Sequence, residues 1–159
     1  MAGLEDLYRE IILDHYRAPR NRGELPVPPA HKAEGFNPLC GDEVVLYLVV
    51  DGDTVTDLKI AGQGCSISQA STSMMSAAVK GKTIDEVHDL TRAFKAMMSI
   101  HESSLEGDDA ELDEVGDVKL GDLEALRGVV KFPVRIKCAT LSWNTLAQGL
   151  EEAEAPAEA

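Results

Sequence analysis

The three cysteines of this chain each lie at a polar turn or at the expected start of a helix, not within an apolar run. Cys40 begins the triplet Cys40-Gly41-Asp42, Cys65 follows the turn Gly62-Gln63-Gly64, and Cys138 follows Arg135-Ile136-Lys137. Because glycine imposes no steric obstacle, the thiolate of Cys40 and the carboxylate of Asp42 can bend toward one ion. With Cys65 and Cys138 they would offer three sulfurs and one oxygen, a donor set that suits zinc or an iron–sulfur unit.

Spacing alone leaves the role of these cysteines open. No CxxC pair is present, and a reduced cysteine can equally be an inert core residue, a metal ligand or a reactive thiol. Residues 1–18 lack the layout of a signal peptide, and three cysteines cannot all pair, so we expect a reduced, cytoplasmic setting. A position at a helix start beside Arg135 and Lys137 would favour Cys138 as a thiolate.

The elements that must position these residues begin with an amphipathic helix that ends before Pro19. Its apolar residues follow helical spacing: Leu4, Leu7, Tyr8, Ile11, Ile12 and Tyr16. His15 lies among them, and we expect it to be a partly buried histidine with hydrogen-bond partners, not a ligand. Residues 19–39 contain five prolines and predict an extended connector. Residues 43–50 and 54–61 predict two strands joined by a hairpin turn at Asp51-Gly52.

Helices are expected to fill the rest of the chain. Residues 66–80 predict a helix whose inward face includes Met74, Ala77 and Ala78. Thr83-Ile84-Asp85-Glu86 is typical of a capping box and starts a helix that runs to about Met98. A short helix is expected over residues 122–127, and a last one begins near Pro133. This order predicts an α+β fold with an antiparallel sheet that helices cover on one face.

The net charge of −13 is concentrated in two segments. Residues 102–117 carry eight acids and no Lys or Arg, and residues 151–159 carry four acids and no base. Without these twelve, 16 acids face 15 bases. We therefore expect a single domain over residues 1–150, with an acidic insertion at about 101–118 and a disordered acidic tail at 151–159. A nucleic-acid partner is not expected, because basic clusters are lacking, and no apolar run is long enough for a membrane span.

Several motifs in order give the chain a resemblance to the U-type iron–sulfur cluster assembly proteins, the IscU/NifU N-terminal family, and within it to the SufU branch. They are Leu7-Tyr8-Arg9, Asp14-His15-Tyr16, Pro19-Arg20-Asn21, Asn37-Pro38, Cys40-Gly41-Asp42, Gly62 to Ser68, Ser73-Met74-Met75, Val79-Lys80-Gly81-Lys82, Leu120 to Leu126, Lys131-Phe132-Pro133 and Arg135 to Trp143. The resemblance covers nearly the whole chain except residues 101–118 and the tail.

The resemblance implies a small α+β domain with a three-stranded antiparallel sheet packed on one face by helices. It also implies that Cys40, Asp42, Cys65 and Cys138 meet at one exposed end as metal ligands. Family members accept sulfur from a pyridoxal-phosphate cysteine desulfurase, and IscU-type members assemble a [2Fe–2S] cluster on these residues. Lys137 departs from the IscU type, which has His before the third cysteine. This departure, with the longer stretch between the second and third cysteines, resembles SufU.

For the SufU branch, the resemblance implies tight zinc binding and sulfur acceptance from a SufS-type desulfurase. Cys40 would take the persulfide, Arg135 would support the site, and sulfur would pass to a downstream scaffold or apo-protein. The chain would then be a sulfurtransferase-type acceptor at most. One alternative is a non-enzymatic scaffold that binds iron and a [2Fe–2S] cluster. Another is a zinc module with a purely structural role in protein interaction.

Overall fold

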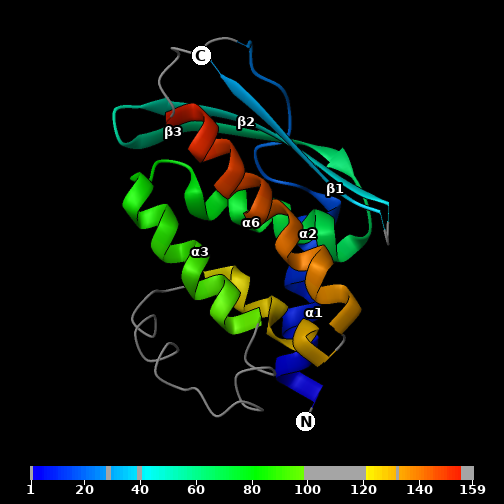
Figure 1. The fold of residues 1–159 in the computed structure, drawn as a ribbon. Coiled ribbons are helices and arrows are strands. Elements are labelled where there is room, and N and C mark those ends of the chain that lie inside the picture. The colour runs from blue at the N-terminus through cyan, green and yellow to red at the C-terminus, as the bar shows by residue number, and fades with distance from the viewer. Residues whose placement is uncertain (1, 28–29, 39–40, 99–120, 132, 155–159) are drawn as a thin grey trace.

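The structure, a computed structural model, describes residues 2–27, 30–38, 41–98, 121–131 and 133–154. Within these residues the elements are, in chain order, α1 (Ala2–Arg17), β1 (His31–Asn37), β2 (Asp42–Asp51), β3 (Thr54–Gln63), α2 (Ser66–Val79), α3 (Ile84–Met98), the 3-10 helix η1 (Gly121–Lys131) and α6 (Pro133–Glu154). The helices lie on one side of a twisted sheet, with α6 crossing it lengthwise (Figure 1). This arrangement confirms the predicted α+β class.

The sheet is antiparallel throughout, in the order β1-β2-β3. The predicted hairpin is confirmed, because Asp51 pairs with Thr54 around a turn in which Gly52 has φ of 66°. Along β2, alternate side chains from Asp42 to Leu48 are buried against the helices, as the two-residue period of a strand requires. Asp42 is therefore an inward-facing residue at the first position of β2.

Strand β1 corrects the expectation that residues 19–39 form only a connector. His31–Asn37 pairs with β2 along its whole length, from His31 opposite Leu48 to Asn37 opposite Asp42. The segment HKAEGFN holds no β-branched residue, so the strand signal was weak. Pairing with the strongly apolar β2 makes it a strand. A prediction from local sequence could not include that contribution.

Helix α6 packs closely against the sheet because glycine occurs at both sides of the contact. A Cβ on Gly35 of β1 would overlap the Thr145 hydroxyl, and a Cβ on Gly149 of α6 would lie 2.8 Å from Leu48 Cδ1. Farther from the sheet, Phe94 of α3 stacks on Trp143 of α6 with ring centroids 4.9 Å apart. The core therefore fixes α6 between the sheet and α3.

The capping box at the start of α3 is confirmed by reciprocal bonds. The Thr83 N–H donates to Glu86 Oε1 at 2.9 Å, and the Glu86 N–H donates to Thr83 Oγ1 at 3.1 Å. The inward face of α2 differs from its prediction at one position, because Ala77 is exposed while Met74 is buried. Helix η1 extends past the expected residue 127 to Lys131.

The acidic segments are described only in part. The insertion at 101–118 and residues 155–159 lie outside the described residues. Residues 151–154, predicted as the start of the tail, belong to α6. No helix in the described ranges is both long and apolar enough to cross a membrane.

Candidate metal centre

Asp42 provides the oxygen of the candidate site. Its side chain is fully buried at the start of β2. Oδ1 accepts a hydrogen bond from the backbone N–H of Cys65 at 3.0 Å, which fixes the orientation of the carboxylate. Oδ2 is also buried and has no hydrogen-bond partner among the residues that the structure describes. A buried carboxylate oxygen without a partner costs free energy unless a cation or proton donor meets it.

Cys65 is the N-cap residue of α2. Its backbone is extended, and its Sγ accepts the N–H of Ser68 at 3.4 Å. Sulfur here replaces the hydroxyl or carboxylate oxygen that most often caps a helix. Helix N-termini favour negative charge, and a cysteine binds metal as the thiolate. The cap therefore both begins α2 and directs Sγ toward the carboxylate of Asp42.

The turn Gly62-Gln63-Gly64 brings Cys65 to Asp42, and both of its glycines are required. Gly62 has φ of 116°, and a Cβ there would overlap the Glu43 carbonyl oxygen. A Cβ on Gly64 would lie 2.5 Å from Asp42 Oδ1. The prediction that backbone passes close to another group at this turn is therefore confirmed.

Arg22 also contacts the turn, although no pattern in the sequence marks it as a functional residue. Its guanidinium donates to the Gly62 carbonyl at 3.2 Å and to Gln69 Oε1 at 3.4 Å. These bonds connect the turn to α2 across the residues that hold Cys65. The only local signal was the position of Arg22 directly after the motif Pro19-Arg20-Asn21.

Cys138 is buried in the second turn of α6. The expectation that the helix dipole favours its thiolate needs correction, because that effect falls off within the first turn. Arg135 precedes Cys138 by three residues on the same helix, so the two lie on neighbouring positions of one face. Arg135 and Lys137 are both exposed.

The fold brings three of the four expected ligands together. One donor atom each from Asp42, Cys65 and Cys138 lies within 4.8 Å of the other two. A tetrahedral zinc site with Zn–S bonds of about 2.3 Å separates its sulfurs by roughly 3.8 Å, so no two of these donors are more than about 1 Å farther apart than in such a site. The unpartnered buried oxygen and the two sulfurs fit a thiophilic cation such as zinc or iron. Cys40, the fourth expected ligand, lies outside the described residues.

Two named relatives match almost the entire chain. The protein designated zinc-dependent sulfurtransferase SufU of Bacillus subtilis is 46% identical over 153 residues, which are 96% of this chain and 95% of that protein. The iron–sulfur cluster assembly scaffold protein IscU of Streptococcus pyogenes is 37% identical over 151 residues, 95% of this chain and 87% of that one.

Solved structures share the fold. A candidate SUF-system scaffold protein from Fervidobacterium islandicum superimposes with a TM-score of 0.73 at 34% identity, covering 93% of this chain and 99% of that one. The N-terminal part of a NifU-like protein from Brucella abortus gives 0.76 at 25% identity, covering 95% and 96%. The NifU-like N-terminal domain family matches residues 7–139. With a family match over most of the chain and relatives at these identities, the chain belongs to the NifU-like N-terminal domain family of iron–sulfur cluster assembly proteins.

Proposed function

We propose that this protein is a zinc-bound sulfur acceptor in iron–sulfur cluster assembly. It takes persulfide sulfur from a SufS-type, pyridoxal-phosphate-dependent cysteine desulfurase and passes it to a downstream scaffold or apo-protein. Cys40, Asp42, Cys65 and Cys138 are the proposed zinc ligands, and Cys40 is the proposed acceptor. Cys40 lies outside the described residues, and it is included because it precedes Asp42 by two residues in the sequence.

The observation that carries the proposal is the buried carboxylate oxygen of Asp42 beside two cysteine sulfurs. Such a group is stable when a cation is bound, and a set rich in sulfur selects zinc or iron over magnesium or calcium. The name of the Bacillus subtilis relative, a zinc-dependent sulfurtransferase, supports both the choice of zinc and the sulfur-transfer role.

The transfer step needs no external oxidant or reductant. Bound zinc would keep the cysteines as thiolates and lower their reactivity until a partner releases one of them. The Cys40 thiolate then attacks the terminal sulfur of the desulfurase persulfide, forming a new S–S bond. The original S–S bond breaks, and the desulfurase cysteine leaves as a thiolate. Arg135 is exposed one turn before Cys138, and we propose that its guanidinium stabilises the terminal persulfide anion.

Radiolabelled sulfur provides the direct test. The purified protein is incubated with a SufS-type desulfurase and sulfur-labelled cysteine, and protein-bound label is measured without reductant. We expect the wild type to carry stoichiometric zinc and to acquire label, while Cys40→Ala acquires none. Arg135→Ala should keep its zinc but acquire label more slowly. Label on Cys40→Ala at the wild-type rate would overturn the assignment of Cys40.

The scaffold role is the second candidate, because relatives named as IscU scaffold proteins match most of the chain. Anaerobic reconstitution of a [2Fe–2S] cluster that transfers to an apo-protein, without activation of the desulfurase, would favour it. If removal of zinc unfolds the protein and Cys40 never acquires sulfur, the site is instead a structural zinc module.

A further inference from the structure

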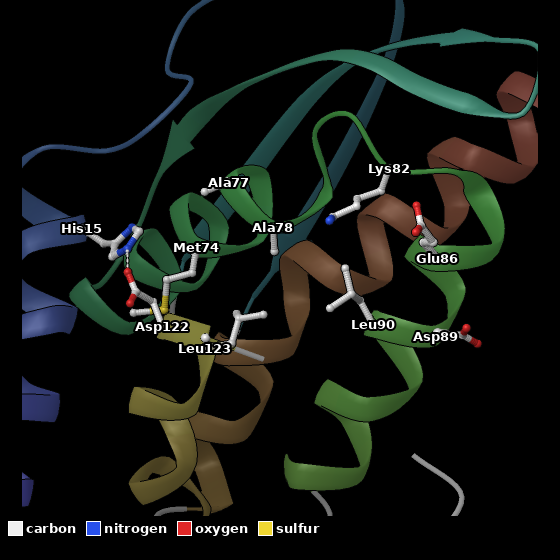
Figure 2. Close-up of a pocket in the computed structure, with 11 residues that line it drawn as sticks. His15, Met74, Ala77, Ala78, Lys82, Glu86, Asp89, Leu90, Asp122 and Leu123 are labelled. Atoms are coloured by element: carbon white, nitrogen blue, oxygen red, sulfur yellow. Dashed lines mark hydrogen bonds and ion pairs between the residues drawn. The ribbon is translucent and has the colours of Figure 1, made fainter. Parts of the chain in front are cut away.

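A second site candidate lies away from the metal centre, in a pocket of about 620 Å³ bordered by α2, α3 and η1. Its base is apolar and is formed by the buried side chains of Met74, Leu90 and Leu123. Ala77 and Ala78 of α2 add small side chains to its wall (Figure 2). Met74 follows Cys65 by nine residues, about 13 Å along the helix axis. The pocket and the metal centre are therefore separate features of α2.

A chain of buried and partly buried hydrogen bonds fixes one carboxylate at the edge of this pocket. The backbone N–H of Arg20 donates to Ser73 Oγ at 2.8 Å, and Ser73 Oγ lies 2.8 Å from His15 Nδ1. The other ring nitrogen, Nε2, lies 3.0 Å from Asp122 Oδ2 (Figure 2). Because an ionised carboxylate only accepts hydrogen bonds, Nε2 carries the hydrogen. In the neutral ring, Nδ1 then accepts the hydroxyl hydrogen of Ser73.

The end of this chain is exposed although its other members are not. His15 is 2% exposed and Ser73 is fully buried, whereas the Asp122 side chain is 58% exposed. An ordinary surface carboxylate loses rotamer entropy when it binds a ligand, but one held by a buried partner has already lost it. The chain His15–Ser73 thus supports Asp122 as a rigid binding group.

The residues that line the pocket include three carboxylates, Asp122, Glu86 and Asp89, and one lysine, Lys82. Glu86 accepts the N–H of Thr83 in the capping box, and Asp89 lies 3.7 Å from the guanidinium of Arg92. The one basic residue of the lining, Lys82, lies across the pocket from Asp122 (Figure 2).

We propose that this pocket docks a basic amphipathic helix of a partner protein. One apolar side chain of that helix would sit against Ala77, which is exposed, and Ala78, which is half-buried, with Leu90 beneath them, and an Arg or Lys would pair with Asp122. The small side chains of Ala77 and Ala78 allow a helix to approach closely. The net charge of −13 also favours encounter with a cationic partner.

The charge of the chain argues against its own acidic segment as the occupant. Residues 102–117 carry eight acids and no base, and a fixed carboxylate would repel them. The docking proposal goes beyond sulfur transfer and does not depend on it, because none of the lining residues is a proposed metal ligand.

A designed peptide tests the pocket directly. The probe is a fluorescein-labelled, Ala-rich helix of about 15 residues with two Leu and one Arg on a single face, long enough to be partly helical in water. Its binding to the zinc-loaded full chain is followed by fluorescence anisotropy. We expect saturable binding that Asp122→Asn weakens about tenfold or more, the effect of one charge-assisted pair. Ala77→Trp, at an exposed position, should block binding by filling the pocket.

Two controls separate docking from general attraction to an acidic protein. Asp85→Asn removes the same charge from an exposed position on α3 that does not line the pocket, and it should change the affinity less than twofold. A probe with Glu in place of Arg should bind at least tenfold more weakly to the wild type. Lack of saturable binding, or equal losses for Asp85→Asn and Asp122→Asn, would overturn the proposal. Zinc content and circular dichroism report whether each variant is folded.

Discussion

The two carboxylate oxygens of Asp42 have different surroundings. Oδ1 accepts the Cys65 N–H and thereby links the start of β2 to the start of α2, while Oδ2 has no hydrogen-bond partner among the described residues and is the oxygen proposed to bind a cation. The link works because Gly64 leaves room for the carboxylate. The orientation of the oxygen ligand therefore depends on a residue that binds no metal itself.

Gly64→Ala should weaken metal binding. The new Cβ would lie 2.5 Å from Asp42 Oδ1 and 3.1 Å from its Cγ, so the carboxylate or the turn must move. We expect a loss of stability of about 1–3 kcal/mol, typical of overpacking, and faster transfer of zinc to a chromogenic chelator. Gly128→Ala is the control, since its Cβ would meet no atom of the described residues within 4 Å. Equal zinc retention in both variants would contradict this account of the turn.

Single residues were predictable where their neighbours in sequence defined them. The glycines before Cys65 indicated a close approach, which is confirmed. The apolar context of His15 indicated a partly buried histidine with hydrogen-bond partners; the partners are confirmed, and the burial is greater than expected, with 2% of the residue exposed. The partners of His15 were not predictable, because Ser73 and Asp122 are 58 and 107 residues away in sequence. The meeting of Asp42, Cys65 and Cys138 was implied by family resemblance, since their spacing matches no metal motif.

At the level of elements, local signals succeeded where a structure is stabilised locally. The capping box, the Asp51-Gly52 turn and the proline at the start of α6 each marked an element correctly. Strand β1 was missed because its hydrogen bonds come from β2, not from its own side chains. Ala77 was expected in the core because of its helical spacing. The expectation was wrong because the neighbouring helices leave Ala77 uncovered, which spacing along one helix does not reveal.

Gly149→Ala tests how closely α6 packs on the sheet. Alanine would favour the helix by about 1 kcal/mol over glycine. Its Cβ would, however, lie 2.8 Å from Leu48 Cδ1 and 3.0 Å from Ala33 Cβ, both in the buried face of the sheet. Overpacking costs of about 1–3 kcal/mol should outweigh that gain, so urea unfolding should show net destabilisation. Asn144→Ala, at an exposed position of α6, should be neutral or stabilising. A stabilised Gly149→Ala would show that the contact adapts.

The link between β1 and the end of α6 gives stability a pH dependence. The hydrogen bond from His31, followed by that from Gln148, holds the pKa of Glu152 below its ordinary value of 4.5. The pKa of Glu152 is therefore lower in the folded protein than in the unfolded chain, and these hydrogen bonds stabilise the fold at pH values above 4.5. The stabilisation is lost as the pH falls through the folded-state pKa. In urea titrations from about pH 7 to pH 3, wild type should lose more stability than Glu152→Gln. The control Glu151→Gln, at the exposed neighbouring position, should lose as much stability as the wild type. Equal losses for the wild type and both variants would contradict the link.

For the whole molecule, the distribution of charge matters more than its total. The acids that make the chain strongly negative lie mostly in residues 102–117 and in the tail, while the remainder is nearly neutral. Around the candidate metal centre the exposed charged groups include Arg22, Arg135 and Lys137. We expect the acidic insertion to influence partners more than metal, because none of its acids is among the proposed metal ligands.

Deleting residues 102–117 should leave zinc content unchanged. The deletion removes eight acids and no bases, so the net charge changes from −13 to −5. Residues 99–101 and 118–120 remain to join α3 to η1, which contact each other. We expect association of the cationic probe helix to slow at low salt, with little change near physiological ionic strength. Replacing the eight acids by Asn and Gln, which keeps the length, should reproduce the effect if charge is its cause. Loss of zinc from the substituted protein would mean instead that these acids stabilise the metal centre, and the separation of charge from site would be wrong.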